Sequence, residues 1–159
     1  MDTTKNETEY SKQLLEQYKL YVQMADNISQ RRQQANQFYI SLLSAVIAIL
    51  AVAIDKDSAE LADMRLIILL ISVMGIIIST IWNININSYR QLNTGKFKVI
   101  HEMEKDLPYP CYDKEWEFLG GGQNSKRYFQ LTRVERWIPI IFSLPYWLLF
   151  LYSVAQLLG

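Results

Sequence analysis

The sequence has little of the chemistry on which catalytic and metal sites depend. Among its 159 residues there are one cysteine, Cys111, and one histidine, His101. A lone cysteine excludes an intrachain disulfide, and one cysteine with one histidine does not supply the paired ligand spacings of a zinc site. Catalysis also needs a nucleophile, a base or a metal ligand that converge, and no such set stands out. We therefore expect a protein that is not an enzyme and that has no cofactor and no metal.

Proline and glycine are absent from a long part of the first half of the chain. Neither occurs between Glu7 and Ile54, so nothing in this stretch interrupts a helix. We expect one helix here, about 70 Å long if straight. Its apolar residues recur at spacings of four and three, and Leu15 and Val22 widen this stripe beyond what one partner helix covers. A neighbouring copy would bury the remainder. The predicted oligomer interface is Leu14, Tyr18, Tyr21, Ala25 and Ile28.

Charge is missing from three long stretches. Ala35–Ile54, Leu66–Ile86 and Trp137–Gly159 contain 20, 21 and 23 residues without a charged side chain. At 1.5 Å per residue the shortest reaches about 30 Å, the thickness of the bilayer hydrocarbon. The alternative is three buried helices of a soluble bundle, but the remaining residues are too few and too charged to surround them. We expect three transmembrane helices.

Lysine and arginine are absent after Arg136. Of the 16 basic residues, five lie in residues 1–37, two in 55–65 and nine in 83–136. Because basic segments stay in the cytoplasm, we expect a cytoplasmic N-terminus and central segment, with a periplasmic C-terminus. The start of the chain also lacks the basic and apolar regions of a signal peptide, so we expect the first span to act as the insertion signal.

These observations predict an all-α membrane protein whose two long helices form a hairpin. Gly95 weakens the second helix and Pro108 ends it. Thr132-Arg-Val-Glu135 has the form of a capping box, so the last helix should begin near Thr132. The predicted segments begin with a cytoplasmic helix at 1–37, which is continuous with a first span at 38–54. An external turn at 55–65 leads to a second span at 66–84, which is followed by a cytoplasmic helix at 85–107. An irregular cytoplasmic segment with a short helix (Asp113–Leu119) occupies 108–136, and a third span occupies 137–158.

Small residues recur on one face of the second span. Ser72, Gly75 and Ser79 are spaced by three and four, so they share a helix face on which another backbone can approach closely. We expect this face to serve helix packing rather than to line a pathway, because no ionisable residue lies inside any span. The first span offers small residues as partners: Ser41, Ser44, Ala45 and Ala48.

Basic side chains flank the first two spans. Arg31 and Arg32 suit topology and lipid contact, or a contact with acidic residues of the central segment in another subunit; both alternatives stay open. Arg90 and Lys98 lie in a basic and aromatic run after the second span. A solvated helix face is one interpretation of this run, but we expect both residues to contact lipid headgroups or acidic residues of a neighbouring copy.

Six stretches of the chain form a combination that is found in a known family. They are Glu16-Gln-Tyr-Lys19, Ala25-Asp26, Arg31-Arg32, Ala35-Asn36, the most specific run Ser88–Glu102, and Tyr112-Asp-Lys-Glu-Trp-Glu117. With them the chain resembles, over almost its whole length, the RipA family of small octameric bacterial inner-membrane proteins. This resemblance implies a ring of eight in the cytoplasmic membrane and no catalytic residue. The layout alone is also similar to the SLATT type of membrane effectors in bacterial conflict systems.

We therefore expect a non-enzymatic oligomeric scaffold or regulatory protein that presents a ring of cytoplasmic helices at the inner membrane. The expected partners are further copies of the chain, as an octamer, membrane lipids and an unidentified protein; no nucleic acid is expected. The alternative is a pore-forming or membrane-disrupting effector in a bacterial stress or phage-defence system. Against this alternative, the spans lack the charged rings that commonly select ions.

Overall fold

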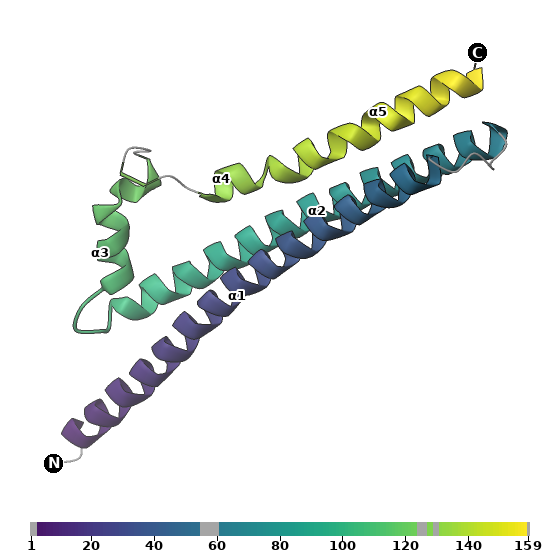
Figure 1. Ribbon diagram of the computed structural model, residues 1–159. Helices are drawn as coiled ribbons and strands as arrows, with labels where there is room; N and C mark the ends of the chain where they lie inside the picture. The colour runs from purple at the N-terminus through teal and green to yellow at the C-terminus, as the bar shows by residue number, and fades with distance from the viewer. Residues whose placement is uncertain (1–2, 55–60, 124–126, 129–130, 159) are drawn as a thin grey trace. The chain divides into compact units, whose positions relative to one another are not determined.

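The computed structural model describes residues 3–54, 61–123, 127–128 and 131–158. Within these ranges the chain is helical and contains no strand, so the predicted all-α class is confirmed for them. Figure 1 shows the elements in chain order: α1 (Thr3–Ile54), α2 (Leu61–Glu104), α3 (Cys111–Phe118), a 3₁₀ turn η1 (Gly120–Gly122), α4 (Leu131–Glu135) and α5 (Ile138–Leu158).

In the part of the chain that the structure describes, three helices are long and apolar enough to cross a membrane. They are Asn6–Val52 of α1, Met64–Glu104 of α2, and Ile138–Leu158, which is α5. In the most apolar stretch of each, only 17%, 22% and 17% of the residues are buried within the chain. Apolar surface on this scale is not left in water by soluble monomers. The length and composition of these helices therefore agree with the three predicted spans.

α2 ends at Glu104, close to the predicted end at Leu107. The amides of Lys105, Asp106 and Leu107 donate to carbonyls three residues back, at 3.3, 3.2 and 3.2 Å. Such bonds tighten the end of a helix into a turn. Pro108 has no N–H and disfavours the helical conformation of the residue before it, so the chain leaves the helix here.

The last part of the chain differs from the predicted single helix beginning near Thr132. α4 ends at Glu135 and α5 begins at Ile138, with a turn between them. Pro139 is the cause, because it has no N–H to donate to the Glu135 carbonyl and its ring clashes with that carbonyl in a continuous helix. The Trp137 amide instead donates to the Val134 carbonyl at 2.9 Å.

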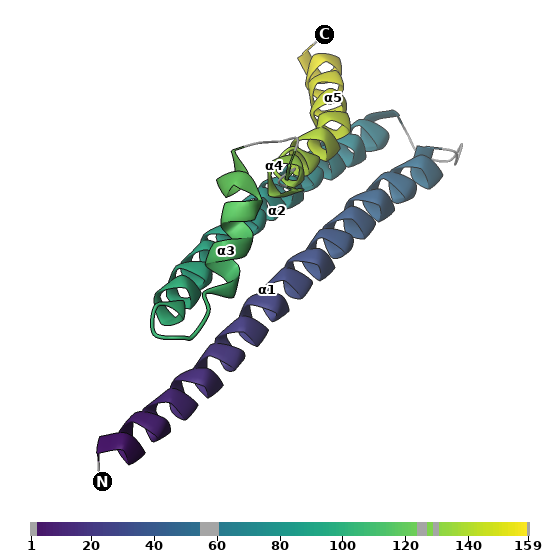
Figure 2. The ribbon, with the colours of Figure 1, turned by 90° about the vertical axis from the view of Figure 1, so that its left-hand side faces the viewer.

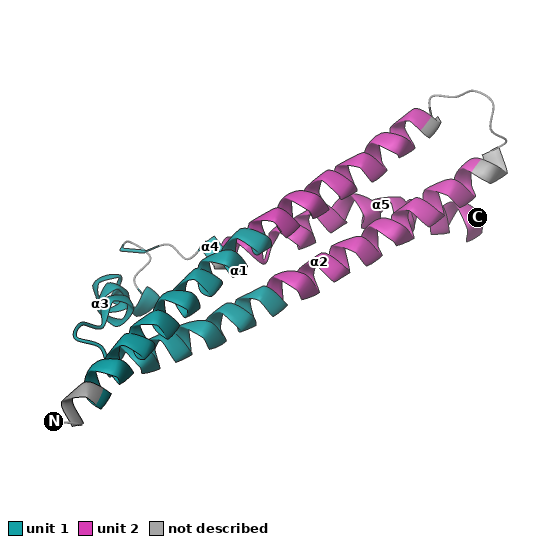
Figure 3. Ribbon diagram, turned by 90° about the horizontal axis from the view of Figure 1, so that it is seen from below, with its two compact units in different colours: residues 1–32, 88–132 teal, residues 33–87, 133–159 magenta. Residues whose placement is uncertain are grey.

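The chain divides into two compact units (Figure 3). Unit 1 comprises residues 1–32 and 88–132, and unit 2 comprises residues 33–87 and 133–159. In unit 1, α3 lies beside the end of α2 (Figures 1 and 2). In unit 2, α5 runs along α2, and the Ser153 hydroxyl donates to the Arg65 carbonyl at 3.1 Å. The buried core of unit 2 is Leu43, Val46, Trp82, Ile86 and Tyr146.

Candidate functional site

Glu104, the last residue of α2, is buried in unit 1, where it is 1% exposed. Its Oε1 accepts hydrogen bonds from the Tyr18 hydroxyl and the Tyr112 amide, both at 2.8 Å. Its Oε2 accepts from the Asp113 amide at 3.0 Å. A buried carboxylate requires such donors. Glu104 therefore links α1 and α3 to its own helix, α2.

The same carboxylate caps α3. The first amides of a helix have no partner inside it, and Pro110 at the start of α3 has no side chain that can accept their hydrogen bonds. Glu104 supplies the acceptor from outside the helix, and its negative charge also suits the positive end of the helix dipole. The position of α3 thus depends on a residue of α2.

Aromatic and charged side chains make further contacts between the helices of unit 1. The Phe97 ring meets the rings of Tyr112 and His101 edge-on, with centroids 5.6 and 6.5 Å apart. Lys96 Nζ lies 4.7 Å from the centre of the Tyr21 ring, within the range of a cation–π contact. These contacts join α2 to α1 and to α3, as the hydrogen bonds of Glu104 do.

Two tyrosine hydroxyls of unit 1, those of Tyr18 and Tyr112, hold their protons more tightly than usual. Burial raises the pKa of Tyr18, and the hydrogen bond to Glu104 raises it further. Burial also raises the pKa of Tyr112, followed by the nearby charge of Asp26. Both phenols are therefore neutral hydrogen-bonding groups at physiological pH.

The predicted oligomer stripe is partly covered within the chain. Ala25 and Ile28 are buried within the chain, Leu14 is half-buried, and Tyr18 and Tyr21 contact residues of α2. The chain itself thus covers much of this stripe. Their role between copies stays a prediction.

A second polar contact lies in the core of unit 2. The fully buried Trp82 donates from its indole nitrogen to Asn36 Oδ1 at 2.9 Å. Its ring stacks on Tyr39 at 5.7 Å and meets Phe142 edge-on at 5.8 Å. Trp82 therefore joins α1, α2 and α5 through one side chain.

The small-residue face of α2 is also buried in unit 2. Ser72 and Ser79 are 0% and 3% exposed, and Gly75 is buried. A Cβ atom at Gly75 would overlap the ring of Tyr146, whose hydroxyl donates to the Leu43 carbonyl at 2.6 Å. Gly75 thus lies against α5. The small residues proposed as its partners on the first span are exposed instead: Ser41, Ser44, Ala45 and Ala48.

The predicted lipid or inter-subunit contacts lie on the surface. Arg31, Arg90 and Lys98 are exposed, and Arg32 is half-buried. Exposure leaves the first three within reach of a headgroup or another chain. Their predicted contact with lipid or with another copy stays a prediction.

Sequence reasoning missed Glu104. The residue continues the spacing of three and four set by Phe97 and Ile100, so it occupies the buried face of its helix. An acidic residue on an apolar stripe was the available signal. Among the residues that the structure describes, no group of three or more His, Cys, Asp or Glu side chains is placed to hold a metal ion.

Comparison of the sequence with known proteins identifies one matching family. The model of the octameric membrane protein family (8xMP) matches residues 15–155. No curated protein and no solved structure matches significantly. The family match includes most of each of the three apolar helices, together with Glu104 and its three hydrogen-bond donors.

Proposed function

Because the chain belongs to the octameric membrane protein family (8xMP), we propose that it is a non-enzymatic scaffold or regulatory protein of a bacterial inner membrane. In this proposal eight copies form a ring whose N-terminal and central helices lie in the cytoplasm and whose C-termini lie in the periplasm. The distribution of basic residues supports the orientation. The resemblance to RipA-family sequences supports the inner membrane as the location.

The observation that carries the proposal is the hydrogen bonding of Glu104 to three donors. It fixes α3 against the two long helices in unit 1, so that α3 presents a defined surface. Trp116 and Phe118 of α3 are 42% and 72% exposed. Exposed aromatic side chains on a fixed element are typical of protein-binding surfaces. Eight copies in one ring would multiply this surface and strengthen the binding of a multivalent partner.

A catalytic role is not part of the proposal. Each oxygen of Glu104 already accepts at least one hydrogen bond from the protein, so the carboxylate is engaged in holding α3. A general base needs access to the proton that it removes, and 1% exposure gives little. We therefore assign Glu104 a structural role, that of holding α3 in place.

The test is a flux measurement on the purified octamer. Reconstituted into liposomes with entrapped dye and potassium, a scaffold retains both, whereas the alternative, a pore-forming or membrane-disrupting effector, releases them in proportion to the protein added. Protein-free liposomes and liposomes with a pore-forming peptide set the two limits. Release by the octamer above the protein-free rate contradicts the proposal.

A further inference from the structure

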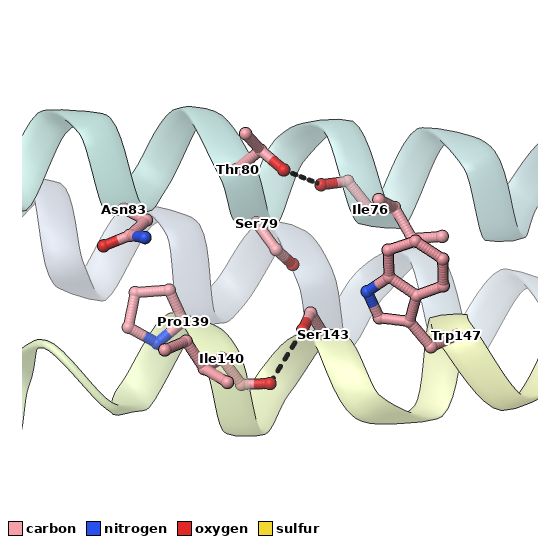
Figure 4. Close-up of a pocket in the computed structure, with 8 residues that line it drawn as sticks. All are labelled: Ile76, Ser79, Thr80, Asn83, Pro139, Ile140, Ser143 and Trp147. Atoms are coloured by element: carbon pink, nitrogen blue, oxygen red, sulfur yellow. Dashed lines mark hydrogen bonds between the residues drawn. The ribbon is translucent and has the colours of Figure 1, made fainter.

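An open groove with a volume of about 100 Å³ lies between α2 and α5 in unit 2 (Figure 4). Asn83 and Pro139 lie at one end of it, and Ile76 and Trp147 lie at the other. Along α2 these ends are separated by about 10 Å, from the rise of an α-helix. The groove is therefore polar at one end and apolar at the other.

The hydroxyl groups between the two ends already donate hydrogen bonds within the protein. Ser79, Thr80 and Ser143 donate to carbonyls of their own helices at 2.9, 2.8 and 2.7 Å. They offer only acceptor oxygens to a ligand. Donors must come from the Asn83 amide and the Trp147 indole, and neither donates to a protein atom within the described part of the chain.

A positively charged residue precedes the polar end of the groove in the chain. Arg136 is exposed and precedes Pro139 by three residues, and no charged residue follows it in the chain. Trp147, in contrast, is ten residues into the uncharged helix α5. The groove thus runs from the boundary of a predicted span toward the apolar middle, with a cation at the boundary.

We propose that this groove binds an anionic phospholipid. The phosphate pairs with Arg136, an ester oxygen accepts from the Asn83 amide, and one acyl chain lies toward Ile76 and Trp147. This order of charge, hydrogen-bond donor and apolar surface matches the order of groups along a phospholipid. A side chain from a neighbouring copy would fit the same volume, but its binding would not require a cation at the boundary.

The experiment counts lipids bound to the intact, full-length octamer by native mass spectrometry. Dioleoyl phosphatidylglycerol and dioleoyl phosphatidylcholine are added separately in mild detergent. Ser143→Phe fills the groove, and Arg136→Gln removes only its charge. Ile141→Phe is the matched control, because Ile141 is 57% exposed on the same helix and does not line the groove.

We expect S143F to weaken the binding of both lipids about tenfold. This factor corresponds to the loss of roughly 50 Å² of apolar contact between the groove and the lipid. We expect R136Q to weaken phosphatidylglycerol binding about fivefold, as for one cation near a charged surface, and to leave phosphatidylcholine unchanged. I141F should bind both lipids like the unmodified chain. Equal loss of the two lipids in R136Q contradicts the anionic assignment.

Thr80→Phe fills the groove from the opposite wall. Because Thr80 is exposed, a larger side chain is accommodated there. This variant therefore tests lipid binding to the groove if S143F fails to insert into the membrane. Unchanged lipid binding in the filled variants overturns the proposal. A reduced oligomer mass with unchanged lipid binding also overturns it, since the groove then holds part of a second copy.

Discussion

At the scale of single residues, Gly75 and Gly95 lie on the same helix but differ in their surroundings. A Cβ atom at Gly75 would overlap the Tyr146 ring, whereas at Gly95 it would meet nothing within 4 Å. We expect Gly75→Ala to destabilise the protein by about 1–3 kcal/mol through overpacking. Gly95→Ala should stabilise it by about 1 kcal/mol through helix propensity. Thermal unfolding in detergent measures both, and equal shifts of the two variants would contradict the close packing at Gly75.

Tyr18 gives a second prediction, on pH. Burial and the bond to Glu104 raise its pKa above the ordinary value of 10.0. The unfolded chain therefore loses this proton at a lower pH than the folded chain does. The resulting stability is complete below about pH 10 and is lost as the pH rises toward the folded pKa.

Tyr18→Phe removes this contribution, so we expect its stability to fall less steeply above about pH 10 than that of the unmodified chain. Tyr112, whose pKa burial also raises, keeps part of the dependence. Melting temperatures measured between about pH 8 and 11 test this. Tyr10→Phe is the control, because Tyr10 is 59% exposed, and it should follow the unmodified chain. Parallel curves for Y18F and the unmodified chain would refute the assignment.

At the scale of elements, α3 depends on a carboxylate that lies outside it. In Glu104→Gln an NH₂ group replaces one acceptor oxygen, so at least one donor among Tyr18, Tyr112 and Asp113 loses its partner. We expect a loss of about 1.5–3 kcal/mol, as for hydrogen bonds to charged groups. Hydrogen exchange at the amides of α3 should become faster. Glu102→Gln, at an exposed position of the same helix, should leave exchange unchanged.

At the scale of the whole molecule, the lone cysteine reports topology. Cys111 is exposed, so burial would not prevent its labelling. We expect a membrane-impermeant maleimide to label it only after the inner membrane is permeabilised, because the central segment carries nine of the 16 basic residues. Labelling in cells whose inner membrane is intact would place this segment outside and reverse the predicted orientation.

Assembly is the second property at this scale. We expect the native mass in mild detergent to be eight times the 18.6 kDa of one chain. Leu20 and Met24 are 57% and 40% exposed, one turn apart on the polar half of α1. A neighbouring copy would bury them, so we expect Leu20→Asp with Met24→Asp to lower the mass while helicity is kept.

The control for this pair is Gln23→Asp with Gln30→Asp, which adds the same charge at exposed polar positions of α1. It should leave the octamer intact. Substitution of Tyr21 and Ile28 is less informative, because both pack inside unit 1 and their loss would disturb the chain itself. An unchanged mass in the Leu20 and Met24 variant would move the subunit contact to the membrane helices.

The sequence by itself determined the three apolar helices and the end of α2 near Pro108. The length of an uncharged run, the helical period and the effect of a proline are local properties, so they can be read without knowing what lies nearby. The same local reasoning identified the buried face of Ser72, Gly75 and Ser79. It placed the short helix α3 within two residues of its observed start.

Only the tertiary structure decided which helix covers that face and what Glu104 does. Gly75 meets Tyr146 of α5 rather than the small residues of α1, because a glycine admits a large ring as readily as another backbone. Glu104 and Tyr18 are 86 positions apart, and no local period connects them. Contacts of this kind depend on which surfaces meet, and many pairings of helices satisfy the same sequence pattern.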